Sequence, residues 1–218
     1  DKLSIQNLDD LEQACLDNKI ANIKGFSPKS QEIILNGIQH VKAWKGKKHQ
    51  FECFDEAKLI EERLKEIPSI SRFSITGDIR RVVEIVSMIS FIAESENPPV
   101  ATKQIADIFN GNIENSTVSF QTNDGIPVTI EVTSPQNYIW RLHNTTANQK
   151  YLERFAEVVK AKTGQDFHLA KFPIENAKIQ TEEDLFKWLG LQFIPSEIRE
   201  DGFAIERAMH NNIPKLIE

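Results

Sequence analysis

The spacing of apolar residues changes near Ser69, and this change constrains the fold more than any other feature of the sequence. Up to that point apolar side chains recur every three or four residues, which predicts helices. Beyond it they alternate, which predicts strands, and Asn123-Asp124-Gly125 is a strong turn signal for a hairpin. Helices are expected over 8–15, 28–41, 54–67, 103–111, 136–163 and 181–190, and strands over 72–76, 82–94, 117–122 and 126–134.

This order of elements predicts an α+β fold built from three modules. A helical module is expected to end at Pro68, a mixed sheet to follow, and a small α+β module to close the chain. Within the sheet we expect the strands that carry Ile75, Val86 and Ile130 to lie together, and we expect Gly111 to end the helix before the hairpin.

Composition and charge narrow the classes of function. The 218 residues carry a net charge of −6, which argues against a surface covered with basic residues for nucleic acid. A local patch is still possible, and KAWKGKKH at 42–49 is the concentrated positive run. No apolar stretch approaches the ~20 residues of a membrane span. Cys15 and Cys53, the two cysteines, fit a reducing cytosol, so a cytoplasmic protein is expected. Because the chain begins without Met, we expect an internal fragment or a processed chain.

The stretch IKGFSPKS lies between the first two predicted helices and is typical of a helix-hairpin-helix element. Such a hairpin directs backbone N–H groups and a helix N-terminus at a DNA phosphate. Gly25 allows close approach of the backbone, and the lysine run after the second helix adds cations. The candidate DNA-binding residues are Gly25, Phe26, Ser27, Lys29, Lys45, Lys47 and Lys48. An ordinary α-hairpin with a solvated lysine face is the alternative interpretation.

Three motifs together resemble the family X DNA polymerases, relatives of DNA polymerase beta. They are LEQACLDNKIANIKGFSPKSQEIILNGI, similar to the fingers hairpin; ITGDIRRVVEIV, similar to the nucleotidyltransferase signature Gly-Ser-x-Arg-Arg; and LGLQFIPSEIRED, similar to a thumb motif. The resemblance covers essentially the whole chain. It implies helix-hairpin-helix fingers over 1–68, a nucleotidyltransferase palm over 69–147 and a thumb over 148–218.

The resemblance also implies partners and a cofactor. Family members act on gapped or primer-template DNA in repair, use Mg²⁺, and in bacteria usually continue into a PHP phosphoesterase domain. We therefore expect a monomer that binds DNA, with a PHP domain in the parent chain and no membrane partner.

The positions that hold the metal-binding aspartates in this family carry other residues here. Counting from Gly77, the paired aspartates fall on Met88 and Ser90, and the third falls on Thr129 in the stretch Val128-Thr129-Ile130-Glu131. A thioether and two hydroxyls are poor ligands for a pair of hard cations. The sequence thus predicts a degenerate site with no catalytic residue, no metal and no cofactor.

The phosphate-handling part of the signature is only partly retained. Gly77, Arg80 and Arg81 form a remnant phosphate-binding group, but Asp78 stands where the family has a serine, and its carboxylate opposes phosphate. The nucleotide hinge also differs, since RLHNTTANQ at 141–149 lacks the aromatic pair of the family.

Three interpretations follow from the sequence. The first is a DNA-binding polymerase core without polymerase activity. The second is an active DNA-directed polymerase with a divergent metal site, which the metal requirement of phosphoryl transfer disfavours. The third is a protein-interaction module that no longer binds DNA, which the negative net charge favours.

Overall fold

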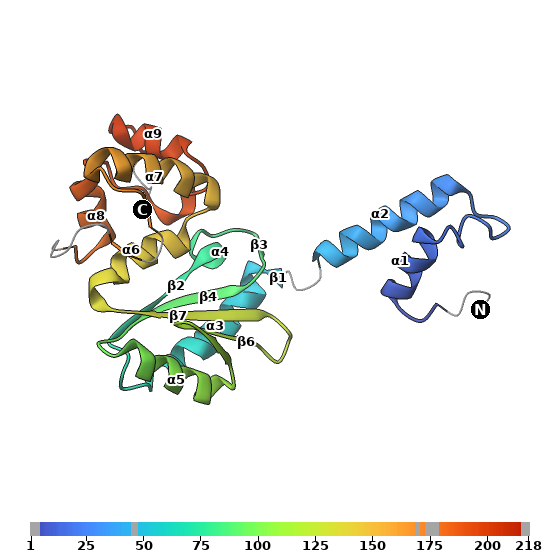
Figure 1. The fold of residues 1–218 in the computed structure, drawn as a ribbon, viewed down its shortest axis with the longest axis horizontal. Helices are drawn as coiled ribbons and strands as arrows, with labels where there is room; N and C mark the ends of the chain where they lie inside the picture. The colour runs from blue at the N-terminus through green and yellow to red at the C-terminus, as the bar shows by residue number, and fades with distance from the viewer. Residues whose placement is uncertain (1–4, 45–47, 169–170, 173–178, 215–218) are drawn as a thin grey trace. The chain divides into compact units, whose positions relative to one another are not determined.

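The computed structural model describes residues 5–44, 48–168, 171–172 and 179–214. The chain divides into two compact units, Asp1–Lys45 and Gly46–Glu218 (Figure 1). Within the described ranges no helix has the length and apolar character needed to span a bilayer.

The first unit is a pair of helices, as predicted. Helix α1 (Leu8–Leu16) begins where the Asn7 side chain accepts a hydrogen bond from the Asp10 backbone N–H, at 2.8 Å. Helix α2 (Pro28–Trp44) starts with proline, which needs no N–H partner at that position. A small apolar core joins the two helices, formed by Ala14, Cys15, Ile20 and Ile38.

The second unit is built on a five-stranded mixed sheet, which confirms the α+β class. The strands are β2 (Arg72–Thr76), β4 (Ile89–Glu94), β5 (Asn112–Glu114), β6 (Thr117–Gln121) and β7 (Pro127–Thr133). Their order across the sheet is β2-β4-β7-β6-β5. Only the central pair, β4 and β7, is parallel, and β6 and β7 form the predicted hairpin through a turn with Gly125 at φ +75°.

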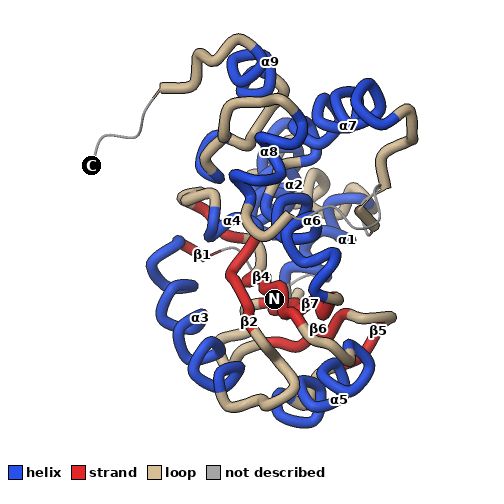
Figure 2. The backbone as a smooth tube through the Cα atoms, turned by 90° about the vertical axis from the view of Figure 1, so that its left-hand side faces the viewer, coloured by secondary structure: helices blue, strands red, loops and turns tan. Residues whose placement is uncertain are grey.

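Helices cover both faces of this sheet. Helices α3 (Gln50–Lys65) and α5 (Pro98–Phe109) lie on one side, and α6 (Pro135–Thr146) lies on the other (Figure 2). Alternation along β4 divides the core accordingly: Phe91 and Ala93 pack with α3 and α5, whereas Ile92 packs with Tyr138 of α6.

The elements after residue 148 are helical in the part of the chain that the structure describes. They are α7 (Gln149–Thr163), α8 (Glu182–Leu189), the 3₁₀ turn η1 (Ser196–Ile198) and α9 (Phe203–Met209). The strands expected of a small α+β module do not occur in the described residues after 148. The predicted caps of α8 are present, with Thr181 at its start and Gly190 in the left-handed conformation at its end.

The predicted strand over 82–94 is wrong as a single element. Its first part is β3 (Ile85–Val86), which pairs with β1 (Lys48–His49) in a separate two-stranded sheet. The expectation that Val86 shares a sheet with Ile75 and Ile130 is therefore wrong. The physical reason is local: the Asp78 carboxylate accepts hydrogen bonds from the backbone N–H and hydroxyl of Ser87, so the chain turns before β4 begins.

Two further expectations about helices differ from the structure. The predicted helix over 54–67 begins earlier, at Gln50, and packs on the sheet through Cys53, Ala57 and Leu64, so the second unit begins well before Pro68. Helix α5 ends at Asn110, which adopts φ +51°, rather than at Gly111. Gly111 is required by packing instead, because a Cβ there would lie 2.4 Å from Val118 Cγ1.

Candidate functional site

Three predicted site residues meet at one point of the sheet: Met88, Ser90 and Thr129. Met88 and Thr129 are 41 residues apart in the sequence. Ser90 of β4 is the register partner of Thr129 of β7, so both side chains project from the same face of the sheet. The Thr129 hydroxyl donates to Ser90 Oγ at 3.2 Å and lies 3.6 Å from Met88 Sδ. The atoms that meet at this point are two hydroxyl oxygens and a thioether sulfur, all of them uncharged.

Thr76 extends this row of hydroxyls onto a third strand. It is the register partner of Ser90 across β2 and β4. The Thr76 hydroxyl is buried and has no hydrogen-bond partner. No other buried side-chain nitrogen or oxygen atom in the described residues lacks one. The sequence analysis missed Thr76, and only the strand register could have identified it. Its hydroxyl is a candidate contact for a ligand at this face.

Gly77 follows Thr76 and opens the four-residue helix α4 (Gly77–Arg80). Its φ of +63° is in the left-handed region that favours glycine. A Cβ at this position would lie 3.5 Å from the Cβ and Oγ of Ser90, so the turn rests directly against the row of hydroxyls.

Asp78 forms an internal clamp. One carboxylate oxygen accepts from Arg81 Nη2 at 2.8 Å, and the other accepts from the Ser87 hydroxyl at 2.9 Å and the Ser87 N–H at 3.2 Å. Asp78 thus neutralises part of the Arg81 charge and closes the loop between α4 and β3.

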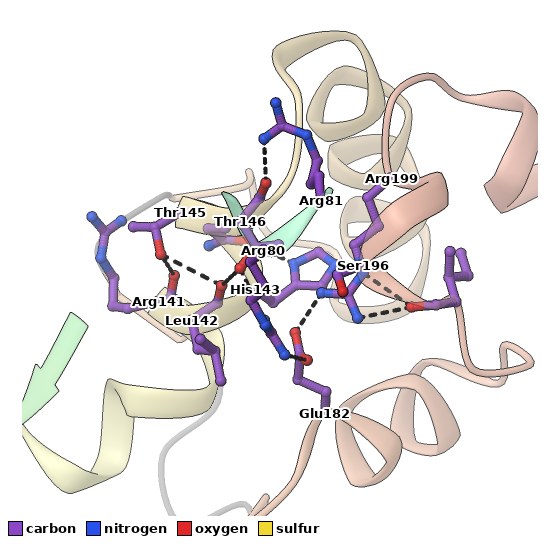
Figure 3. Close-up of polar contacts among 12 residues, drawn as sticks. Arg80, Arg81, Arg141, Leu142, His143, Thr145, Thr146, Glu182, Ser196 and Arg199 are labelled. Atoms are coloured by element: carbon purple, nitrogen blue, oxygen red, sulfur yellow. Dashed lines mark hydrogen bonds and ion pairs between the residues drawn. The ribbon is translucent and has the colours of Figure 1, made fainter. Parts of the chain in front are cut away.

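Arg80 and Arg81 are bound by groups from α6, from α8 and from the turn after η1, of which Figure 3 shows Thr146 and Glu182. Arg80 donates to Thr146 Oγ1 at 2.9 Å and to Glu182 Oε2 at 2.5 Å. Arg81 donates to the Thr146 carbonyl and to Glu200 Oε1, each at 2.6 Å. Both guanidinium groups therefore have carboxylate partners within the chain.

Glu182 lies at the centre of this network and is buried. Its second oxygen accepts from Arg199, whose guanidinium is completely buried and also donates to the Ile194 carbonyl (Figure 3). Burial opposes ionisation of Glu182, but the charges and hydrogen bonds of Arg199 and Arg80 outweigh it and hold the pKa of Glu182 at about 2. Glu182 is therefore an anion at neutral pH.

His143 of α6 packs beside this network. Its ring contacts Asn144 Oδ1 at 3.0 Å and the Tyr151 hydroxyl at 3.2 Å. Complete burial, and secondarily the Arg199 charge, lower the pKa of His143 to about 3. The imidazole is neutral at physiological pH and belongs to the packed interior.

Glu131, the acid nearest Thr129 in sequence, is paired with Arg141 of α6 by two hydrogen bonds. The described residues contain no cluster of three or more His, Cys, Asp or Glu side chains placed to hold a metal ion. The absence of a metal in this protein remains a prediction.

The predicted DNA-binding residues fall into three groups. Gly25 has φ +100° with open space around it, Phe26 is exposed, and the Ser27 hydroxyl caps α2 by accepting from the Ser30 N–H at 3.1 Å. Lys29 lies in the exposed first turn of α2, and Lys48 belongs to β1 in the second unit. Lys45 and Lys47 lie outside the described residues.

Several residues of the site were missed from the sequence, namely Thr146, Glu182, Arg199, Glu200 and Ser87. Glu182 was noted only as an acid of the first helical turn, and Thr146 as part of the hinge. A sequence signal existed for Arg199, which directly follows LGLQFIPSEI at 189–198, a largely apolar stretch without a cation.

Comparison with known proteins gives one informative similarity. No family model matches the chain. The chain is 24% identical over 216 residues to the DNA polymerase/3'-5' exonuclease PolX of Bacillus subtilis (strain 168). This similarity supports a relationship to the family X polymerases. The alignment covers 94% of this chain and 38% of that relative, so the chain spans well under half of its length.

Proposed function

We propose that this chain is a polymerase-X-like core that binds DNA and does not transfer nucleotides. In this proposal the first unit is the fingers hairpin, residues 69–147 form the palm, with α3 packed on its sheet, and 148–218 form the thumb. The observation that carries the proposal is the meeting of Met88, Ser90 and Thr129 at one point of the sheet with no carboxylate among them.

The charges around this point support the loss of nucleotide binding. To bind a triphosphate, the arginines must be free to donate hydrogen bonds to it. Here both are already paired with carboxylates: Arg80 with Glu182, and Arg81 with Glu200 and Asp78. An incoming triphosphate would have to displace these carboxylates, which the protein holds at no cost in translational entropy. Two functions of the site, metal binding and triphosphate binding, are thus opposed by separate residues.

Primer extension tests the catalytic part of the proposal. The purified chain is expected to add no nucleotide to a gapped or primer-template DNA with Mg²⁺ or Mn²⁺. The variant Met88→Asp/Ser90→Asp/Thr129→Asp is expected to bind Mg²⁺ at best, because Asp78 and the internal ion pairs still oppose the triphosphate. Extension by the wild-type chain that EDTA abolishes, and that a mock preparation lacks, would refute the proposal.

Electrophoretic mobility shift on gapped DNA tests the binding part. Weak, sequence-independent binding that falls with salt is expected through Gly25, Ser27, Lys29 and the lysine run, because each phosphate contact releases counterions. Replacing Lys45, Lys47 and Lys48 by Glu is expected to weaken it. If the wild-type chain does not bind, the protein-interaction interpretation stands instead. A PHP domain in the parent chain remains a prediction that the full-length gene tests.

A further inference from the structure

Aromatic rings and a lysine gather on the exposed side of α3. The rings of His49 and Phe51 are stacked, with centroids 6.0 Å apart and planes inclined by 17°. Phe54 lies one turn further along the helix, with Lys58 Nζ 4.6 Å from its ring centroid. Phe51 is 72% exposed and Phe54 48% exposed. We call His49, Phe51, Phe54 and Lys58 the aromatic platform.

The backbone beneath the aromatic platform is firmly held. His49 pairs with Ile85 across β1 and β3, and its N–H donates to the Glu52 carboxylate at 3.0 Å. The Gln50 N–H donates to the Glu84 carbonyl, also at 3.0 Å. The opposite face of α3 is buried in the core through Cys53, Ala57, Ile60 and Leu64. The rings are therefore not needed for the core, and they are presented outward by a fixed element.

Exposed rings next to cations match the chemistry of unpaired nucleic-acid bases. Every base has a π-face that stacks on an aromatic side chain, whatever its sequence, and lysines beside the rings meet the phosphates. Phe51 already continues a stack from His49, and its large exposed area leaves room for one more planar ring. Lys58 supplies the cation beside the rings, with its Nζ 4.6 Å from the centroid of the Phe54 ring.

We propose that the aromatic platform binds unpaired bases of single-stranded DNA by stacking. This inference rests on the proposed DNA binding and deepens it, because it names an unpaired strand as the form of DNA that this surface takes. In a duplex each base is stacked between its neighbours, so its faces are not available to stack on the aromatic platform. Protein docking fits less well, since the charged residues Asp55 and Lys58 follow the rings along α3 and interrupt the apolar surface.

Fluorescence anisotropy with a labelled oligothymidylate of about 20 nucleotides, and with a blunt duplex of the same length, tests the proposal. Phe51→Ala is expected to weaken binding of the oligothymidylate about tenfold and to leave duplex binding nearly unchanged. Phe51→Trp is expected to retain binding, because the indole also stacks. Both substitutions are at an exposed position, and circular dichroism would verify the fold.

Phe203→Ala is the matched control. Phe203 is 62% exposed and Arg207 lies over its ring at 4.7 Å, so it reproduces an exposed ring with a cation on α9, in another part of the unit. It is expected to leave oligothymidylate binding unchanged. An equal loss for Phe51→Ala and Phe203→Ala, or no loss for Phe51→Ala, would overturn the proposal. So would a change in self-association on sedimentation of Phe51→Ala, which would identify a protein-docking surface.

The two proposals fail in distinguishable ways. Lys29→Glu in the hairpin is expected to weaken duplex binding and to leave the Phe51-dependent part of oligothymidylate binding in place. If duplex binding depends on Lys29 but oligothymidylate binding does not depend on Phe51, the platform is overturned and the proposed function stands. Oligothymidylate binding that depends on Phe51, from a chain that shows no hairpin-dependent duplex binding, supports the platform and overturns the role of the hairpin.

Discussion

Two neighbouring regions of the second unit differ in charge. One is the pair of strands that carries Ser90 and Thr129, and the other is the short helix α4 with Arg80 and the adjacent Arg81. At the strand ends every group is neutral, and hydroxyls bond to one another. At the helix, charge is dense, but each arginine has a carboxylate partner from the chain itself. The comparison suggests that neither region depends on a bound ion or phosphate for its own stability. Internal partners of this kind stabilise the site, because unpaired guanidinium groups in a partly buried site are costly.

The largest expected effect comes from breaking the charged region. Glu182→Gln removes the carboxylate shared by Arg80 and Arg199 and leaves the fully buried Arg199 charge without its anion. The free energy of unfolding is expected to fall by about 3–5 kcal/mol, as for other broken buried ion pairs. Urea denaturation at neutral pH measures it.

Glu183→Gln is the control for that experiment, because Glu183 is adjacent on α8 and exposed. It is expected to change the unfolding free energy by less than about 0.5 kcal/mol. A loss below about 1 kcal/mol for Glu182→Gln would show that the network contributes little, and the contrast between the two regions would then lose its energetic basis.

Acidification sharpens the same comparison, since the titrating groups lie on the charged side. The pKa of His143 is depressed from 6.5 to about 3, so the unfolded chain binds a proton more readily than the folded protein. The contribution of neutral His143 to the free energy of unfolding is therefore fully present above about pH 6.5. It is lost as the pH falls toward 3, at about 1.4 kcal/mol per pH unit. The depressed pKa of Glu182 adds a further loss as the pH falls from about 4.5 toward 2.

Urea denaturation between pH 7 and 5 isolates the histidine, because Glu182 stays ionised there. In His143→Gln this part of the pH dependence is expected to flatten, although the variant itself is less stable. An unchanged slope would contradict neutral burial of His143. Ser90→Ala, at the neutral strand end, is expected to keep the wild-type slope, since it removes no titrating group.

The smallest expected effect concerns the loop that joins the two regions. Val82 adopts φ +60°, a left-handed conformation that is unfavourable for a β-branched residue. Because Val82 is exposed, Val82→Gly removes this strain without leaving a cavity and is expected to raise the unfolding free energy by about 1 kcal/mol. Thermal denaturation measures the gain. Val83→Gly, next to it and without positive φ, is the control and is expected to destabilise.

Much of the fold was predictable because it depends on local sequence. Asn7 and Thr181 cap their helices by contacts within four residues, Gly190 ends α8, and the turn at Gly125 fixes the hairpin. The split of 82–94 was not predictable in this way. The apolar alternation continues past Ser87, but the Asp78 carboxylate, nine residues earlier, accepts a hydrogen bond from the Ser87 N–H and interrupts the strand.

The sequence by itself determined most of the helices and strands. It also carries Met88, Ser90 and Thr129 where the resemblance leads us to expect aspartates, and Asp78 where it leads us to expect a serine. Only the tertiary structure decided that Arg80 and Arg81 are paired, since their partners Glu182 and Glu200 lie 102 and 119 residues away. It also decided that His143 and Arg199 are buried beside each other and that Thr76 lies in the row of hydroxyls. The physical reason is that periodicity and caps act over a few residues, whereas ion pairing and desolvation depend on which distant segments the fold brings into contact.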